Sequence, residues 1–241
     1  MTTLVLGGSG ATGKQLVAQL LKKGEQVKVI VRSSGNLPGA WQHEEKLSII
    51  KANISEVSVD EMANYLKDCR AVASCLGHNL TLKGMYGPPR MLVTNAVRLL
   101  CDAIEKNSAK DPVKVVLMNT TGNRNRNLNE PISFGQRFVV GLLRMLLPPH
   151  RDNENAADHL RLEIGQDHPL IQWLAVRPDN LIDENGVTEY ELYFSPTRSA
   201  IFNPGKTSRI NVGHFMARLI AEDELWNKWK GQMPVIYNRT N

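Results

Sequence analysis

The sequence LVLGGSGATGK, at residues 4–14, decides the fold of this protein. A short apolar run ends there in three glycines that are spaced three residues apart, Gly7, Gly10 and Gly13. The next segment carries one apolar face and ends at Gly24; the face consists of Leu16, Val17, Leu20 and Leu21. This spacing is typical of an amphipathic helix that a glycine terminates. We therefore predict a buried strand, a glycine-rich turn and a helix.

The rest of the chain repeats this alternation. Apolar runs predict strands at residues 3–6, 27–31, 47–50, 71–76, 113–118 and 173–176. Helical patterns lie at 59–67 and 91–106, and Asn211 is predicted to cap a helix near the C-terminus. Strands this apolar suit a parallel sheet that is covered on both faces. We predict a doubly wound α/β fold in a single domain, 1–241, with a small irregular cap after about residue 180.

Composition and charge exclude several classes of protein. Apolar residues make up 42% of the 241 residues and charged residues 22%, an ordinary globular balance. The net charge of +5 comes without a dense basic stripe interleaved with aromatic residues, so we expect no nucleic-acid partner. No apolar run reaches the roughly 18 residues of a membrane span. We expect no signal peptide, because residue 7 already lies in a predicted loop.

The three cysteines indicate a reducing compartment. Cys69, Cys75 and Cys101 are odd in number and share no C-x-x-C spacing. We therefore expect free thiols in a cytoplasmic protein and no metal site. A reactive Cys75 is the alternative, but a cysteine within an apolar run is usually inert core.

The glycine-rich turn is predicted to bind the pyrophosphate of a dinucleotide. A helix N-terminus offers unpaired N–H donors and the positive end of the helix dipole, and glycines let the backbone approach a phosphate closely. The spacing is G-x-x-G-x-x-G rather than G-x-G-x-x-G, but the strand and helix on either side strengthen the motif. A plain strand–helix turn is the alternative. The predicted contacts are Gly7, Ser9, Gly10, Ala11, Thr12 and Gly13.

The end of the second strand favours NADP over NAD. Sites specific for NAD place an acidic residue there, against the ribose hydroxyls. This chain instead has Arg32, followed by Ser33. A guanidinium can pair with a 2′-phosphate through two hydrogen bonds. A solvated surface arginine is the alternative interpretation.

Later strand ends are predicted to complete the site, because ligands bind beyond the carboxyl ends of parallel strands. Asn53 and Ile54 are expected to flank the adenine. Leu76, Gly77 and His78 are expected to approach the nicotinamide ribose, and Asn119 with Thr120 or Thr121 the nicotinamide. We consider His78 as a general acid; a solvated loop histidine is the alternative.

With these motifs in place, the sequence resembles the atypical short-chain dehydrogenases, single-domain Rossmann proteins that include NmrA-like proteins and NAD(P)H-flavin reductases. The motifs are GGSGATGKQLVAQLLKKG, VKVIVRSS, VVLMNTTG and WLAVRPDNLID. In this family the segment after the RP turn covers the nicotinamide, which implies this role for Pro178, Asn180 and Leu181.

The second half of the chain looks like the biliverdin-IXβ reductase and flavin reductase branch. The matching stretches are LLPPHRDNENAADHLRLE and TSRINVGHFMARLI. By this resemblance Thr120 takes the place of a serine near the hydride and Asn180 that of a histidine. His159 stands where a catalytic lysine is sought.

One departure from the family bears on the chemistry. Typical short-chain dehydrogenases use Tyr-x-x-x-Lys to protonate a carbonyl, and no tyrosine here has a lysine four residues later. A flavin or another conjugated acceptor can take hydride directly and collect its proton from water, which requires positioning above all. We therefore predict a reductase of such an acceptor. The alternatives are a non-catalytic NADP-sensing regulator or assembly factor and, less favoured, a sugar-nucleotide epimerase.

An insertion at 123–150 separates the fifth strand from the next family motif. We predict that Asn123–Asn129 form an exposed loop and that a helix over 133–147, capped by Ser133, is buried on most sides. A lid over a flat substrate and a contact with a partner or a membrane surface are the alternatives. Residues 181–210 are predicted to lie on the substrate side, and Arg124, Arg126 and Arg151 to meet an acidic substrate.

Overall fold

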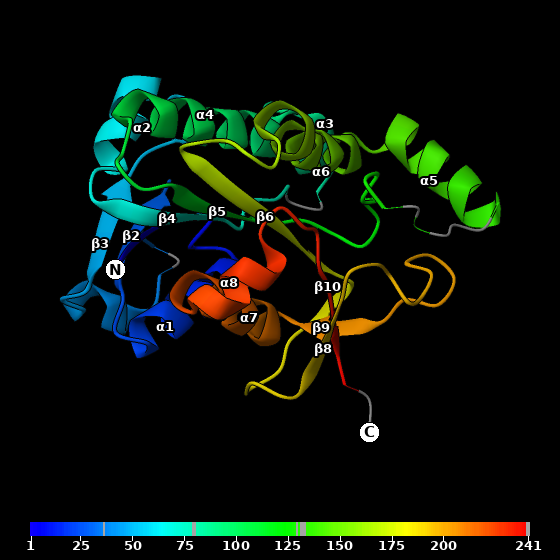
Figure 1. Cartoon of the computed structure of the whole chain (residues 1–241). Helices are drawn as coiled ribbons and strands as arrows, with labels where there is room; N and C mark the ends of the chain where they lie inside the picture. The colour runs from blue at the N-terminus through cyan, green and yellow to red at the C-terminus, as the bar shows by residue number, and fades with distance from the viewer. Residues whose placement is uncertain (36, 79–80, 129, 131–133, 240–241) are drawn as a thin grey trace.

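An eight-stranded sheet forms the centre of the protein (Figure 1). The computed structural model describes residues 1–35, 37–78, 81–128, 130 and 134–239. The strand order is β3–β2–β1–β4–β5–β6–β10–β8. Each neighbouring pair from β3 to β10 is parallel, and β8 pairs antiparallel with β10. The strands are β1 (Thr2–Leu6), β2 (Gln26–Val31), β3 (Leu47–Lys51), β4 (Cys69–Ser74), β5 (Val113–Met118), β6 (Ile171–Pro178), β8 (Tyr190–Tyr193) and β10 (Val235–Asn238).

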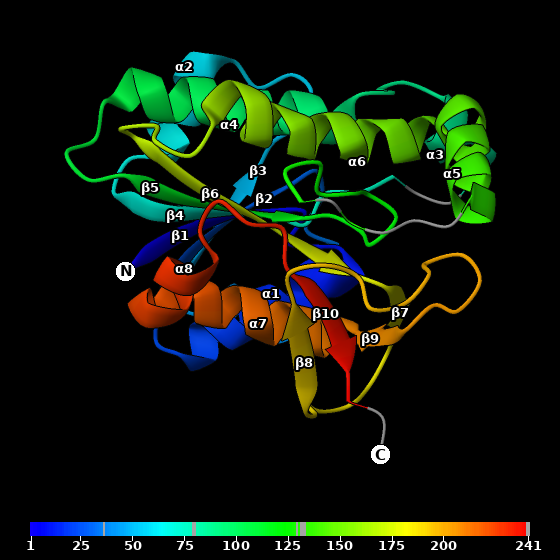
Figure 2. The same cartoon turned by 45° about the vertical axis from the view of Figure 1, so that its right-hand side comes forward.

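Helices cover both faces of the sheet (Figure 2). One face carries α1 (Ala11–Lys22), α7 (Arg209–Ala221) and α8 (Asp223–Trp229). The other carries α2 (Val59–Tyr65), α4 (Leu92–Asn107) and α6 (Pro148–Asp158). At the end of this second layer lie α3 (Leu82–Tyr86) and α5 (Phe134–Leu146). The remaining elements are the short helix η1 (Gly39–His43), the π-helical segment η2 (His159–Ile164) and a two-stranded sheet of β7 (Asn180–Ile182) and β9 (Lys206–Ser208).

Each face of the sheet has its own apolar core. Residues of α2, α4 and α6 pack on one side of β1, β4 and β5, whereas α1, α7 and α8 pack on the other. The α1–α7 contact is close, because a Cβ on Gly213 would lie 2.7 Å from the Leu16 nitrogen. This arrangement fixes α1, and with it the glycine-rich turn, against the sheet.

The predicted doubly wound sheet is confirmed, and the six predicted strands end within two residues of the observed ones. Two details near the C-terminus are wrong. The helix begins at Arg209 with Ser208 as its cap, because the Ser208 hydroxyl accepts a hydrogen bond from the Asn211 N–H. The predicted irregular cap contains β8 and β10, which extend the central sheet. Strands of four residues carry too short a pattern to be recognised in the sequence.

The insertion also differs from its prediction. Asn123 and Asn125 are buried rather than exposed, because the buried ion pair of Arg177 and Glu130 holds this loop. Arg177 donates to the Asn123 carbonyl, and the Glu130 carboxylate accepts from the Asn125 N–H. The predicted helix exists as α5 but is not buried on most sides, as shown by Phe134, which is 86% exposed. Ser133 and Asn129 lie outside the described residues.

Candidate functional site

The glycine-rich turn presents the uncapped N-terminus of α1. Gly7 has a φ of +74°, and a Cβ on it would lie 2.7 Å from the Cys75 carbonyl. A Cβ on Gly13 would overlap the carbonyl oxygen of Gly7. Gly10 is the N-cap of α1, so it offers no side-chain cap, and no acidic residue occupies the first turn. The first N–H groups of this 12-residue helix are thus available to an anion.

A groove of about 770 Å³ opens beside this turn, over the carboxyl ends of β1 to β4. Among its lining residues are eight of the predicted cofactor contacts: Gly7, Ser9, Gly10, Arg32, Asn53, Ile54, Leu76 and Gly77. Its walls also include residues that the sequence motifs did not identify, above all Pro88, Pro89 and Leu92 before and at the start of α4. The groove therefore gathers parts of four strand ends, as the fold class requires.

The mouth of the groove at β2 is basic. Arg32 is exposed and has no ion pair or side-chain hydrogen bond with any residue of the described chain. The Ser33 hydroxyl accepts a weak hydrogen bond from Gly35 at 3.3 Å and can still donate. Glu56 also lines the groove, but its carboxylate accepts a hydrogen bond from the Asn53 amide at 2.7 Å. Arg32 is thus available to an anionic ligand.

His78, at the end of β4, is neither solvated nor free. Its Nε2 lies 2.7 Å from the Asp152 carboxylate and its Nδ1 lies 3.2 Å from the Gly84 carbonyl. The side chain is 4% exposed. Because both ring nitrogens have partners, neither is available to a substrate in this arrangement. The geometry favours a positioning role for His78 over that of a general acid.

The loop after β5 is held from α6. The Asn119 amide donates to the Asn153 carbonyl at 2.9 Å, and its oxygen accepts from the Thr120 N–H at 2.9 Å. Both the nitrogen and the oxygen of the Asn119 amide therefore form hydrogen bonds within the protein. The Thr120 hydroxyl accepts a hydrogen bond of 3.3 Å from the Gly122 N–H, which leaves its proton free to be donated. Thr121 is buried.

His150, in the first turn of α6, was not identified as a site residue from the sequence. A Cβ placed on Gly122 would lie 3.4 Å from His150 Cε1, 3.8 Å from His150 Nδ1 and 3.7 Å from the Thr120 hydroxyl. The imidazole and the Thr120 hydroxyl thus flank the same point beyond β5. The His150 Nε2 is buried without a hydrogen bond and lies 3.7 Å from the Glu154 carboxylate. Burial lowers the pKa of His150, which favours the neutral ring.

The segment after β6 lies beside this loop. The Pro178 carbonyl accepts from the Thr121 N–H at 3.1 Å. Asn180 is exposed and Leu181 is partly buried, both in β7, which pairs with β9. Asp179, which lies between Pro178 and Asn180 in the sequence, accepts a hydrogen bond from the Gly205 N–H at 2.8 Å. Burial raises the pKa of Asp179, although hydrogen bonds from Gly205 and Thr121 oppose the shift.

Several other candidate residues already have partners or are inert. Arg124 donates to the Glu130 carbonyl and Arg126 pairs with Asp158, whereas Arg151 is exposed. His159 is buried, 2.9 Å from the Glu163 carboxylate. Cys75 is buried, and burial raises the pKa of its thiol to about 12, which favours an inert thiol.

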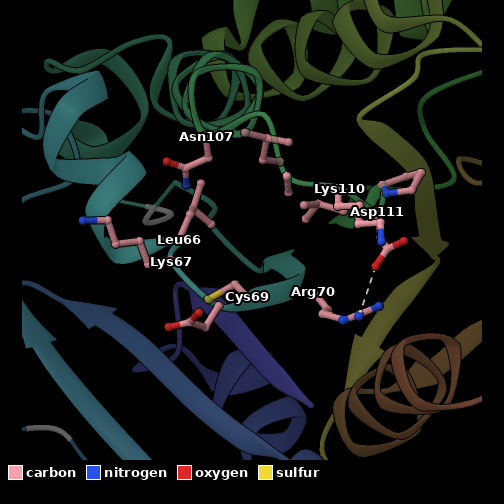
Figure 3. Close-up of a pocket in the computed structure, with 12 residues that line it drawn as sticks. Leu66, Lys67, Cys69, Arg70, Asn107, Lys110 and Asp111 are labelled. Atoms are coloured by element: carbon pink, nitrogen blue, oxygen red, sulfur yellow. Dashed lines mark ion pairs between the residues drawn. The ribbon is translucent and has the colours of Figure 1, made fainter.

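A second pocket, of about 530 Å³, lies at the amino ends of β4 and β5 (Figure 3). Lys67, Lys110 and Asn107 line it, and across its rim Arg70 pairs with Asp111 at 3.1 Å. The pocket is therefore at the opposite ends of the strands from the glycine-rich turn. Ligands of doubly wound sheets bind at the carboxyl ends, so we place the candidate site in the other groove.

The comparisons with known proteins identify the family of the chain. The model of the NAD(P)H-binding family matches residues 7–223, and the chain belongs to this family. None of the curated proteins matches the sequence. No helix within the described residues combines the length and the apolar character needed to cross a membrane.

Solved structures share the fold at low identity. The oxidoreductase ylbE from Lactococcus lactis is 16% identical with a TM-score of 0.70, and the match covers 100% of this chain and 92% of that one. A candidate NADH-flavin reductase from Streptococcus pneumoniae is 17% identical over 99% and 100% of the chains, with a TM-score of 0.68. A short-chain dehydrogenase/reductase from Veillonella parvula, in complex with NADP, is 13% identical over 98% and 94%, with a TM-score of 0.69. At these identities the likeness establishes the fold alone.

Proposed function

We propose that this member of the NAD(P)H-binding family is an NADPH-dependent reductase that transfers hydride to a conjugated small molecule, such as a flavin or a quinone. The observation that carries the cofactor half of the proposal is the Arg32 guanidinium at the mouth of the groove, which is unpaired among the residues that the structure describes. A 2′-phosphate would give this cation an oppositely charged partner, whereas the ribose hydroxyls of NAD are neutral.

The residues around the groove fit a dinucleotide. Gly7, Gly10 and Gly13 keep the turn free of side chains, and the uncapped N-terminus of α1 offers N–H donors to a pyrophosphate. Asn53 and Ile54 would flank the adenine, and Leu76 and Gly77 the nicotinamide ribose. When bound there, a reduced nicotinamide supplies the hydride.

The acceptor half of the proposal rests on the residues beyond β5. The sequence has no Tyr-x-x-x-Lys pair to protonate a carbonyl. The Thr120 hydroxyl retains a proton that it can donate, and the His150 ring presents its Cε1 and Nδ1 to the same point. These groups can orient a conjugated acceptor by hydrogen bonds, which is sufficient where the acceptor collects its proton from water.

Titration with the nucleotides tests the cofactor half of the proposal, and turnover assays test the acceptor half. We expect micromolar binding of NADPH, measured by the quenching of intrinsic fluorescence, and weaker binding of NADH. Equal affinities would overturn the role of Arg32. We further expect NADPH oxidation with flavins or quinones and none with simple aldehydes. Turnover of aldehydes in place of the conjugated acceptors would overturn the acceptor class.

A non-catalytic NADP-binding regulator is the second candidate function. The observations that favour it are the engagement of both His78 nitrogens and of the Asn119 amide with the protein itself. Tight NADPH binding without oxidation across the flavins, quinones and aldehydes would support this candidate over the reductase.

A further inference from the structure

The apolar face of α5 points away from the rest of the protein. Its large side chains are strongly exposed, with fractions of 86% for Phe134, 68% for Phe138 and 75% for Met145. Leu142 and Leu146 are exposed by 41% and 50%. Residues 134, 138, 142, 145 and 146 repeat at helical spacing and share one side of the helix. We call these five residues the α5 apolar face.

Neighbouring side chains extend this surface at both ends of α5. At its start, Phe202 is 62% exposed, and its ring would lie 3.5 Å from a Cβ on Gly135. At its end, the hydroxyl of Tyr86, which is 44% exposed, donates to the Leu146 carbonyl at 3.1 Å. A continuous apolar surface of this kind on a protein marks an interaction site.

The opposite side of α5 is fastened to the protein. Val140 is buried, and Arg144 clamps the buried Glu154 of α6 with contacts of 2.7–2.9 Å. Figures 1 and 2 show α5 at the far end of its helical layer, beyond α6. The helix is thus anchored by its polar edge and presents its apolar side outward.

The charges around α5 are predominantly positive. Between residues 120 and 151 the sequence contains five arginines, at positions 124, 126, 137, 144 and 151, and Glu130 as its one acid. Two nearby carboxylates pair with arginines within the protein, Glu130 with Arg177 and Glu154 with Arg144. The Asp152 carboxylate is buried and accepts hydrogen bonds from the N–H groups of Val93 and Thr94. Arg90 and Arg151 are exposed and form no ion pair with another described residue. Of the arginines in this segment, Arg124, Arg126 and Arg144 already have partners. The cations that the described chain leaves for an anionic partner near the end of α5 are therefore Arg90 and Arg151.

We propose that α5 docks onto an anionic lipid surface with its apolar face against the acyl chains. A surface helix with aromatic and aliphatic side chains on one side and exposed arginines near its end fits an interfacial helix, which lies on a bilayer without crossing it. Anionic headgroups attract the flanking arginines. A second copy of the chain is the weaker alternative, because a symmetric contact over α5 would bring like-charged edges together.

Vesicle co-sedimentation tests this proposal with the full chain. We expect binding to phosphatidylcholine vesicles that contain phosphatidylglycerol, weak binding to phosphatidylcholine alone, and a decrease as salt is raised. The double variant Phe138→Asp/Met145→Asp should bind the anionic vesicles at least about tenfold more weakly. Val187→Asp is the matched control, because Val187 is an exposed apolar residue outside α5 and its replacement should leave binding unchanged.

Three results would overturn the proposal: undiminished binding by the double variant, equal binding to neutral vesicles, or no vesicle binding at all. A concentration-dependent dimer that the double variant abolishes, seen by analytical ultracentrifugation without vesicle binding, would identify a second copy as the occupant. Circular dichroism melting curves of the variants check that they fold, which is expected for substitutions at exposed sites. The proposal is independent of the reductase activity, since NADPH titration reports on the groove alone.

Discussion

His78 Nε2 lies 2.7 Å from Asp152 Oδ2, and this contact joins the loop after β4 to α6. The same carboxylate accepts hydrogen bonds from the N–H groups of Val93 and Thr94, at 2.8 and 2.9 Å, and so caps α4 from another helix. Met91, the N-cap of α4, provides no side-chain cap of its own. One buried acid thus fixes β4, α4 and α6 relative to one another.

Replacement of Asp152 should therefore destabilise the whole site. Asp152→Ala leaves two N–H groups of α4 and the His78 ring without their acceptor in a buried place, and we expect a loss of about 3–5 kcal/mol in the free energy of unfolding. Urea denaturation measures this loss. Asp223→Ala is the control, because Asp223 pairs with Lys114 but is 87% exposed, and its removal should cost far less stability than that of Asp152. Equal losses in the two variants would contradict the role of Asp152.

The sequence was sufficient to predict those parts of the site whose residues lie within one local pattern. The turn from Gly7 to Gly13 carries its strand and helix beside it, and Arg32 follows directly from the next strand. By contrast, His78 and Asp152 are separated by 74 positions, and their contact depends on how α6 packs against α4. His150 lies near Gly122 for the same reason, because this contact also depends on the packing of α6. In the sequence, only the residue type of His150 pointed to a role in the site.

The prediction for α5 failed for a different reason. From the sequence, a helix with a wide apolar face is predicted to lie in the core. The periodicity gives the width of the apolar face, but it does not show what covers that face. The structure leaves Phe134 and Phe138 exposed and buries Val140. Short strands such as β8 and β10 were missed because their pairing is set by distant partners, with Ile236 opposite Leu192.

Arg32→Glu should reverse the cofactor preference. If Arg32 pairs with a 2′-phosphate, a carboxylate at this position repels that phosphate and can accept from ribose hydroxyls instead. A charged hydrogen-bonded pair contributes about 1.5–3 kcal/mol, so NADPH affinity should fall by about 10–100-fold while NADH affinity holds or rises. Fluorescence titration with both nucleotides provides the comparison. Lys51→Glu, an exposed charge reversal at the end of β3, is the matched control. A proportional loss for both nucleotides in Arg32→Glu would show that the change acts on the groove as a whole.

Gly13→Ala should destabilise the turn itself. The added methyl group would overlap the Gly7 carbonyl oxygen, and neither can rotate away, because the oxygen belongs to the backbone and the backbone fixes the position of Cβ. Overpacking of this kind costs about 1–3 kcal/mol, which corresponds to a fall in Tm of several degrees in a chain of this size. Thermal melting followed by circular dichroism detects it. Gly39→Ala introduces the same methyl group where nothing lies within 4 Å, and its Tm should stay near that of the unaltered protein.

His150 should make the stability of the protein depend on pH. Burial lowers its pKa below the ordinary value of 6.5, with a further contribution from the nearby Arg144 and an opposing one from Glu154. The folded state therefore keeps the ring neutral, whereas the unfolded chain takes up a proton as the pH falls through 6.5. The free energy of unfolding should decrease as the pH is lowered below that value, and level off once the folded ring is also protonated.

His150→Gln should make the free energy of unfolding less dependent on pH. The slope should fall by at most about 1.4 kcal/mol per pH unit, which is the largest slope that the uptake of one proton can produce. Urea denaturation at a series of pH values between about 5 and 7.5 measures the difference. The profile should not become flat, because burial also lowers the pKa of His214, which contributes in the same direction. His214→Gln is therefore the matched comparison. If His150 faces the acceptor, the imidazole NMR signals of His150 should also shift when NADP is added, and those of His214 should not. Parallel stability profiles for the unaltered protein and His150→Gln would show that the ring titrates alike in both states, against the geometry beside Gly122.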